Sequence, residues 1–356
     1  MGVKYSLPRS FTSYRNAVQV ELKKVIDSCP PALGHILRYH MGWQDERGHS
    51  CDRESGKFIR STLCLLSCQA VGGNRWQVMP AAAAVELIHN FSLIHDDIED
   101  ASCERHHRPT IWKLWGQSQA INAGDAMFTL AYLALLELKE KGIAPEKVAV
   151  SAKMLSLACL ELCEGQYRDV EYEDSLDITI EDYLDMAAKK TAALFAVSTS
   201  LGAYLSSDDS RLPDLFASFG KELGIAYQIC DDISGIWGTE ENSGKSAGDI
   251  SQRKKTLPIV YGLQNSNGEA RKRLDRLYSQ KSIEGKNIKE VTRILDKLGT
   301  RDYAENLAEQ HYYKALAQLE ATSLATSKQA PLKKIACFLL KRDFQEGKCR
   351  KRLLKI

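Results

Sequence analysis

Two clusters of aspartates, each at the end of an apolar segment, constrain the fold more than any other feature of the sequence. The first lies in His95–Asp100 and the second in Gln228–Gly235. Each follows apolar residues at three- and four-residue spacing, which is the period of an amphipathic helix. Clustered carboxylates repel one another and resist burial unless a cation compensates them. We therefore predict two helices that together form a site for Mg²⁺ and a phosphate ligand.

The same helical period recurs along most of the chain, while alternating strand patterns are nearly absent. The predicted helices are Ala81–Asp100, Ala120–Lys141, Glu146–Val170, Ile180–Leu205 and Leu212–Asp232. No shift in composition marks a domain boundary. We predict an all-α protein that forms a single domain over residues 1–356, with many helices around a central cavity. A short basic tail, expected to be solvated, begins at about residue 345.

Composition excludes several classes of protein. A net charge of +2 gives no support for a nucleic-acid partner. The ten cysteines include no CxxC pair, and no secretory signal precedes them, which favours reduced thiols and a cytoplasmic location. We find no uninterrupted apolar run long enough to span a bilayer, so stable membrane insertion is not expected.

The first cluster has the spacing of a metal-binding motif. On a helix, Asp96 and Asp100 lie one turn apart on the same face, so both can reach the same ion. Asp97 points partly aside and is expected to orient or supplement those ligands. Asp231 could hold a metal from the opposite wall. A lone DDxxD is more often a solvated helix end, so the assignment depends on the other motifs.

Several cationic segments could meet phosphate oxygens. Lys57 and Arg60 lie on one side of a predicted helix, where Arg offers a planar fork and Lys a compact charge. Further candidates follow along the chain: Arg105, Lys190, Lys245 and Lys254. Any one of these is more often a solvated surface charge than a ligand. Their repeated placement beside apolar helices favours a role in binding.

The order of the motifs is highly specific. From the amino terminus they are GKxxR at Gly56–Arg60, ELIHxxSLIHDDxxD at Glu86–Asp100, Gly124-Asp125, GQxxD at Gly165–Asp169, Lys190-Thr191, QxxDD at Gln228–Asp232 and KxTLP at Lys254–Pro258. This series resembles the trans-isoprenyl diphosphate synthases, the polyprenyl synthetase family that includes short-chain farnesyl and geranylgeranyl diphosphate synthases. The resemblance implies the type I isoprenoid synthase fold and a homodimer.

The resemblance also implies roles for individual residues. The metal ligands would be Asp96, Asp100 and Asp231, with Asp97 also in the catalytic group and Mg²⁺ as the ion. The allylic diphosphate would be held by Arg105, Lys190, Thr191, Gln228, Lys245 and Lys254. Isopentenyl diphosphate would be held by Lys57, Arg60 and His89, and His106 is a further substrate-binding candidate. Ionisation of the allylic C–O bond would then be followed by attack of the isopentenyl double bond on the cation.

The chain departs from the family pattern at several positions. Gly235 stands where many relatives carry a third aspartate, and His106 stands where they tend to have arginine. Ser55 and Ser61 replace a common Gly and Pro, and Ala192 replaces a frequent Gly. A histidine is only partly protonated near neutrality. If His106 contacts isopentenyl diphosphate, its binding should weaken as the pH rises above the histidine pKa.

Residues before Asp96 are expected to set product length. Ser92 lies one turn below the metal face, with Ile88 a further turn away and Phe91 to one side. A single aromatic beside a serine favours a pocket for a C20 geranylgeranyl product over C15 farnesyl. Phe91 could equally be ordinary core packing.

Two other functions share these motifs. A class I terpene synthase would ionise a prenyl diphosphate without isopentenyl diphosphate, and the departures at Ser61, His106 and Gly235 keep that alternative open. A regulatory subunit of a prenyl synthase is the other alternative. The retained Lys57, Arg60 and His89 argue against the first, and the intact aspartates argue against the second.

Overall fold

The computed structural model describes residues 9–51, 53, 56–238, 248–280 and 282–341. Within these ranges the chain is mostly helical, and a short antiparallel pair, β1 (Glu104–Arg105) and β2 (Arg108–Pro109), forms the sheet. The prediction of an all-α fold is confirmed. Ser55, Lys245 and the predicted basic tail lie outside the described residues.

The predicted helices correspond closely to the observed ones. They are α4 (Met79–Glu99), α6 (Gln117–Leu136), α7 (Pro145–Tyr172) and α10 (Leu212–Trp237). The fifth prediction, Ile180–Leu205, is helical throughout but is divided into α8 (Ile180–Ala187), the π-helix η2 (Ala188–Ala192) and α9 (Ala193–Ser206). A π-helix inside a longer helical run is frequently found at a functional site.

The chain forms two compact units, which we call the N unit (residues 6–159 and 197–217) and the C unit (160–196 and 218 onward). Helices α7, α9 and α10 each run from one unit into the other. The single domain around a central cavity remains a prediction.

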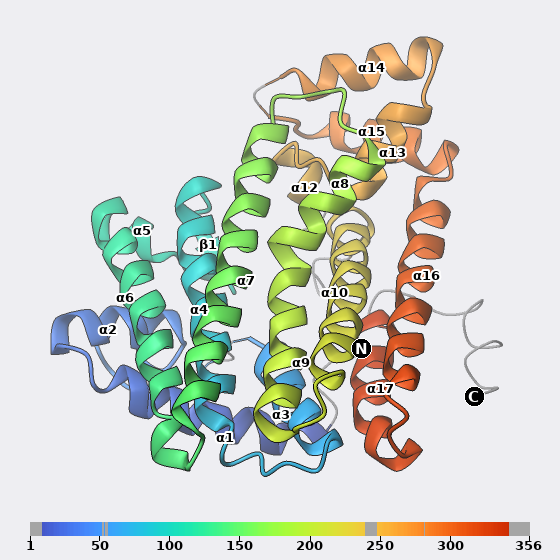
Figure 1. Ribbon diagram of the computed structural model, residues 1–356. Helices are drawn as coiled ribbons and strands as arrows, with labels where there is room; N and C mark the ends of the chain where they lie inside the picture. Colours follow the sequence, from blue (N-terminus) through green and yellow to red (C-terminus); the bar gives the residue numbers. More distant parts are fainter. Residues whose placement is uncertain (1–8, 52, 54–55, 239–247, 281, 342–356) are drawn as a thin grey trace. The chain divides into compact units, whose positions relative to one another are not determined.

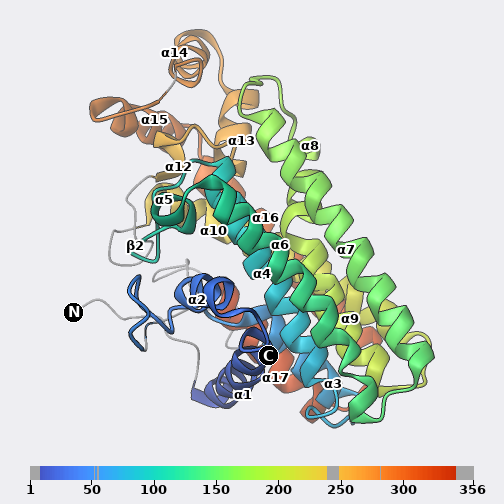
Figure 2. The same cartoon turned by 90° about the vertical axis from the view of Figure 1, so that its left-hand side faces the viewer.

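The N unit is organised around α4, which packs against α6 and α3 (Figure 2). Its other elements are α1 (Arg9–Ile26), α2 (Pro31–His40), α3 (Ile59–Ala70), α5 (Ile111–Trp115) and the 3₁₀ turn η1 (Lys139–Lys141). Pro80 in the first turn and the buried run Ala81–Ala84 favour helix at the start of α4. Burial of this half of α4 fixes the aspartates at its carboxyl end.

The C unit continues from α10 into a group of shorter helices (Figure 1). They are α12 (Gly248–Ser251), α13 (Leu257–Asn265), α14 (Gly268–Tyr278), α15 (Lys286–Lys297), α16 (Thr300–Ala321) and α17 (Thr326–Lys341). Ile236 at the end of α10 shares a buried apolar cluster with Ile259, Leu274 and Leu295. This cluster anchors the start of α13, and thereby the KxTLP motif.

One described stretch, Gln117–Lys141, is long and apolar enough to cross a membrane by length and composition alone. In its most apolar window, 44% is buried inside the protein. Core helices of soluble proteins meet the same criteria, and α6 packs against α4 along its length. The stretch therefore does not indicate a transmembrane segment by itself.

Candidate active site

Acidic residues gather at the carboxyl end of α4, where a helix disfavours them. Asp96 and Asp97 lie in the last turns, Asp100 is the C-cap, and the last turn contains no basic residue. The partial negative charge at a helix carboxyl end repels carboxylates. Asp96 and Asp100 are partly buried, which adds a desolvation cost. An arrangement that opposes stability in this way is typical of a functional site.

Asp97, unlike Asp96 and Asp100, is buried, and its carboxylate pairs with Arg105. Its carboxylate is 4% exposed and accepts two hydrogen bonds from Arg105 Nε, at 2.9 and 3.1 Å, with Arg105 Nη2 also 2.9 Å away. Burial raises the pKa of Asp97, although Arg105 opposes that shift. The pair fixes the guanidinium of Arg105 against Asp97. That Asp97 orients or supplements the metal ligands remains a prediction.

Arg105 lies on a β-hairpin that was not predicted from the sequence. Strands β1 and β2 pair Arg105 with Arg108, and the intervening His106 and His107 have φ of 52° and 59°. Positive φ at both turn positions is the mark of a type I′ hairpin, which normally prefers Asn and Gly. Partial burial, then repulsion from Arg105 and Lys57, lowers the pKa of His106. Its predicted titration therefore moves to lower pH.

The GKxxR motif forms the start of α3 and meets α4. Arg60 Nη1 donates to His89 Nε2 at 3.1 Å, which requires the tautomer with hydrogen on Nδ1. Burial, and then the charge of Arg60, holds the pKa of His89 well below its usual value, so this imidazole is neutral. Phe58, between Lys57 and Arg60, is buried with a φ of 53°. A strained aromatic residue here fits a segment shaped for binding.

The serine at position 61 has a structural use. Ser61 Oγ donates to Glu86 at 2.8 Å, and its backbone N–H donates to the same carboxylate at 3.4 Å. Glu86 is 4% exposed, and burial raises its pKa. The proline common in relatives could make neither bond. Ser61 thus joins the first turn of α3 to α4 and supports the Arg60–His89 contact.

The two aspartates of the second pair, on α10, differ in burial. Asp231 is exposed, whereas Asp232 is 4% exposed. Burial raises the pKa of Asp232 to about 7, although hydrogen bonds to its carboxylate oppose the shift. Asp231 alone of this pair is accessible to a ligand.

The π-helix η2 holds the Lys190-Thr191 motif in the C unit. Lys190 Nζ donates to Asp169 Oδ2 at 2.6 Å, and Thr191 Oγ1 donates to Gln228 Oε1 at 2.6 Å. A side chain at Gly165 would meet the backbone nitrogen of Lys190 at 2.1 Å, so glycine permits α7 to approach η2. Burial would raise the pKa of Asp169, but Lys190 and then Lys254 hold it lower. Both cations therefore act on one carboxylate.

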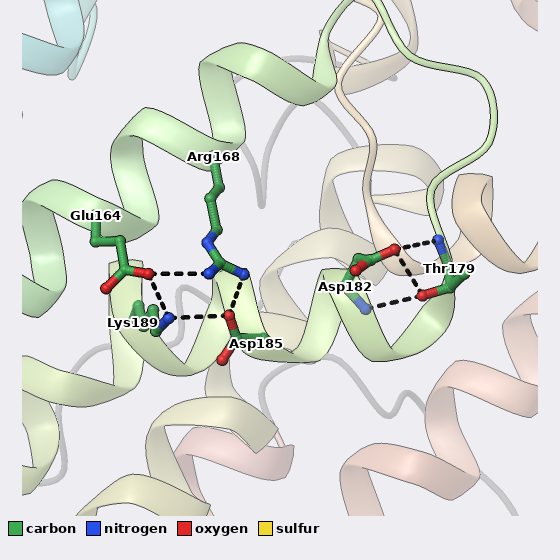
Figure 3. A network of polar contacts seen from close by, with 6 residues as sticks. All are labelled: Glu164, Arg168, Thr179, Asp182, Asp185 and Lys189. Carbon is green, nitrogen blue, oxygen red and sulfur yellow. Dashed lines mark hydrogen bonds and ion pairs between the residues drawn. The ribbon is translucent and has the colours of Figure 1, made fainter.

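The neighbouring lysine belongs to a different network (Figure 3). Glu164 accepts from Arg168 at 2.9 Å and from Lys189 at 2.5 Å. Asp185 pairs with the same two cations. These contacts tie α7 to α8 and η2. Lys189 is thus a structural partner of carboxylates, while Lys190 is the lysine of the motif.

Gly235 makes room for another carboxylate. A Cβ added at Gly235 would lie 1.8 Å from Asp249 Oδ2, which belongs to α12. The carboxylate therefore occupies the space where a side chain at position 235 would begin. The sequence showed a missing third aspartate, but it could not show that Asp249 approaches the same place.

The predicted product-length residues face different surroundings. Phe91 contacts His95 and Phe128 edge-to-face at 4.9 and 5.3 Å between ring centroids. Ser92 Oγ donates to the carbonyl of His89 at 2.8 Å, and Ile88 is fully buried. Phe128 on α6 was not singled out from the sequence. Gly124 allows His95 to approach α6, since a Cβ there would meet its Nε2 at 2.1 Å.

Within the described residues, no group of three or more His, Cys, Asp or Glu side chains is arranged to hold a metal ion by itself. Asp96 and Asp100 belong to the N unit and Asp231 to the C unit. Their hard carboxylate oxygens suit Mg²⁺, and the acidic end of α4 would be stabilised by a cation. The predicted set of three ligands remains a prediction.

The chain is similar in sequence to known proteins over most of its length. The polyprenyl synthetase family model matches residues 46–295. The chain is 38% identical over 301 residues to a geranylgeranyl diphosphate synthase of Mycobacterium tuberculosis, covering 84% of each protein. It is 34% identical over 328 residues to the (2E,6E)-farnesyl diphosphate synthase of the same species, covering 90% of this chain and 89% of the relative.

A solved structure of another protein has a similar fold. The geranylgeranyl pyrophosphate synthetase of Pyrococcus horikoshii has a TM-score of 0.82 at 32% identity, and the match covers 93% of this chain and 97% of that one. Fold, motif order and similarity over most of the length coincide. The chain therefore belongs to the polyprenyl synthetase family.

Proposed function

We propose that the protein condenses isopentenyl diphosphate with an allylic diphosphate to give a short-chain, all-trans prenyl diphosphate. The observation that carries the proposal is the contact of Arg60 with His89 beside Lys57 in the unit that also holds Asp96 and Asp100. A terpene synthase has no use for a second diphosphate site of this kind. The names of the relatives support the same class of reaction.

The allylic diphosphate would be bound by both carboxylates and cations. Mg²⁺ held by Asp96, Asp100 and Asp231 would supply charge stabilisation to the departing pyrophosphate. Arg105, Lys190 and Lys254 would bind the same oxygens through charge-assisted hydrogen bonds. Lys190 would exchange or share its contact with Asp169, which holds the ammonium in place beforehand.

The second substrate would be oriented by the GKxxR side of the site. Lys57 and Arg60 would hold the isopentenyl diphosphate, and neutral His89 and His106 would add hydrogen bonds. Its terminal alkene carbon forms the new C–C bond to the allylic cation, which leaves a tertiary cation at the other alkene carbon. A proton then leaves the methylene carbon on the diphosphate side of that cation, and its C–H electron pair forms the new double bond. Released pyrophosphate is the base that we propose for that proton.

The chain length of the product would be set at the Phe91 level of α4. Phe91 and Phe128 together present an aromatic pair, while Ser92 turns its hydroxyl back to the helix carbonyl. The small Ser92 favours a C20 product, with C15 as the alternative. Both lengths occur among the names of the relatives.

A homodimer is part of the proposal. The N-unit portions of α6 and α7 expose large apolar side chains: Ile121, Leu133, Leu136, Val150 and Leu157. Tyr132 Oη on α6 and Ser156 Oγ on α7 lie within hydrogen-bond distance at 2.9 Å, so the two helices lie together. Exposed apolar side chains on adjoining helices are typical of a protein–protein interface. The nine described cysteines are not joined in disulfides, which supports a cytoplasmic location.

One assay tests the proposed reaction. Purified protein with Mg²⁺ is incubated with dimethylallyl, geranyl or farnesyl diphosphate, with and without isopentenyl diphosphate. Elongated diphosphates that require isopentenyl diphosphate support the proposal. Hydrocarbon or alcohol formed without isopentenyl diphosphate would contradict it in favour of a terpene synthase. No product in any mixture would favour a regulatory subunit.

A further inference from the structure

Asp232 joins three elements of the C unit. Its Oδ2 accepts hydrogen bonds from Tyr183 Oη at 2.6 Å and from the backbone N–H of Leu257 at 2.8 Å. Its Oδ1 accepts from Gln228 Nε2 at 2.8 Å. Tyr183 is 1% exposed, so this junction lies in the interior. The donors come from α8, from the first residue of α13 and from α10 itself.

Each arm of the junction leads to a candidate for diphosphate binding. Tyr183 lies on α8, which continues directly into η2 and Lys190. Gln228, which donates to Asp232, also accepts a hydrogen bond from Thr191 through its amide oxygen. Leu257 follows the segment that begins with Lys254. The buried carboxylate of Asp232 is therefore hydrogen-bonded to the elements that adjoin Lys190 and Lys254.

The bond to Leu257 is a helix cap supplied by another helix. Thr256, the N-cap of α13, makes no side-chain cap hydrogen bond, and Pro258 has no N–H to offer. The carboxylate of Asp232 instead satisfies the N–H of Leu257 and places negative charge at the positive end of α13. Lys255 adds a second anchor, because its Nζ donates to the carbonyl of Glu173 at 2.6 Å. Both anchors follow Lys254 in the chain, and the backbone N–H of Lys254 itself donates to the carbonyl of Asp249 at 2.9 Å.

These contacts distinguish Asp232 from a metal ligand. Three of the roughly four lone-pair positions of a carboxylate are already used by donors at good distances. Mg²⁺ needs near-ideal octahedral geometry, which an inward carboxylate in this junction does not offer. Asp231, one residue earlier, is exposed.

We propose that Asp232 is a positioning residue, which fixes the segments carrying Lys190 and Lys254 relative to Asp231 so that both cations act on one diphosphate. This inference rests on the proposed function for the identity of the ligand. Its consequence is a separation of effects between the two aspartates. Loss of Asp231 should weaken metal binding, whereas loss of Asp232 should weaken diphosphate binding at saturating metal.

The test uses inorganic pyrophosphate and Mg²⁺ with the full chain, measured by titration calorimetry, and thermal unfolding of each variant. Asp232→Ala should weaken pyrophosphate binding at saturating Mg²⁺ by roughly tenfold or more, since the cations lose their shared geometry. The half-saturating Mg²⁺ concentration at saturating pyrophosphate should not change. Asp232→Asn should recover most of the affinity, because its amide oxygen can still accept from Leu257 and Tyr183.

Glu222→Gln is the matched control. Glu222 lies on the same helix and accepts a 2.6 Å hydrogen bond from His311, but that contact leads to no candidate cation. It should lower thermal stability without changing pyrophosphate affinity. An equal loss of affinity in Glu222→Gln would overturn the inference, because any weakening of α10 would then suffice.

Further outcomes decide the remaining cases. If Asp232→Asn is as defective as Asp232→Ala and both require more Mg²⁺, Asp232 is a metal ligand and the inference is wrong. If Asp232→Ala does not fold, Tyr183→Phe decides, with a several-fold loss of affinity expected and an unchanged affinity contradicting the inference. A wild-type protein that binds Mg²⁺-pyrophosphate but does not elongate substrates would refute the proposed function alone.

Discussion

The two aspartate pairs look alike in sequence but are held in different ways. In Asp96-Asp97 the inner carboxylate meets a cation, Arg105, in a bidentate pair. In Asp231-Asp232 the inner carboxylate accepts hydrogen bonds from three neutral donors on Tyr183, Gln228 and Leu257. In each pair the first aspartate is the more accessible. We propose that the first aspartate of each pair serves the ligand and the second serves the framework.

The largest effect should come from the accessible aspartates. Asp96→Ala is expected to lower kcat/KM by about a thousandfold or more, because metal stabilisation of a departing phosphate is worth several kcal/mol. Asp231→Ala should have a similar effect. Steady-state kinetics across a Mg²⁺ series measures both. If either variant remains as active as the wild type, that aspartate is not part of the metal site.

Breaking the charged inner pair should cost stability as well as activity. Arg105→Ala would leave the buried carboxylate of Asp97 without its partner, at a cost of about 3 kcal/mol. Urea unfolding measures this effect, with the double variant Arg105→Ala, Asp97→Asn as control. The double variant should regain stability but not activity. A double variant no more stable than Arg105→Ala would show that the unpaired charge is not the cause.

Restoring the aspartate that relatives carry at position 235 should be harmful. Gly235→Asp would place a Cβ against Asp249 Oδ2 and bring two carboxylates together, at an expected cost of about 1–3 kcal/mol. The control is the double variant Gly235→Asp, Asp249→Ala, which should recover part of that loss in thermal unfolding. A single variant more stable and more active than the wild type would contradict the close approach.

The hairpin beside the first pair predicts a pH effect. The pKa of His106 is lowered, so its charged form exists only below its usual range. Isopentenyl diphosphate binding should therefore tighten as the pH falls from about 6.5 through the lowered pKa. His106→Arg should bind several-fold more tightly at pH 7 and lose this dependence. KM for isopentenyl diphosphate across pH 5–8 tests it; an unchanged pH profile in the variant would exclude the contact.

The smallest effect on rate is expected at Phe91, where the product itself should change. Phe91→Ala removes one ring of the aromatic pair with Phe128 and should lengthen the product with little change in turnover. Val20→Ser, at an exposed position of α1, is a control that should leave product length unchanged. Chromatography of the dephosphorylated products gives the answer. An unaltered distribution would make Phe91 ordinary core packing.

The sequence predicted the helices of the motif region well because their apolar period is strong and α4 and α10 are long. It did not predict the π-helix at Lys190, which depends on the approach of Gly165 from another helix, or the hairpin at His106, whose turn lacks the usual Asn and Gly. Gly165 permits the first through close approach, and Asp97 receives Arg105 from the second. A mid-helix KT dipeptide and a His-His turn carry no strong local signal.

The candidate residues were predicted by motif order, whereas their supports were not. Asp169 was noted only as part of a motif, and Tyr183 was not noted. Glu86 lies within a recognised motif, but its bonds to Ser61 follow from packing of α3 on α4. A sequence reports which side chains are present at each spacing. It does not report which of two adjacent carboxylates turns inward.

The most direct test of the central claim follows the carbon atoms of isopentenyl diphosphate. Wild-type protein is supplied with ¹³C-labelled isopentenyl diphosphate, dimethylallyl diphosphate and Mg²⁺, and the products are analysed by mass spectrometry. The account predicts a C20 or C15 diphosphate in which every added isoprene unit is labelled, and no such product from Asp96→Ala. A product without label, or labelled product formed equally by Asp96→Ala, would contradict it.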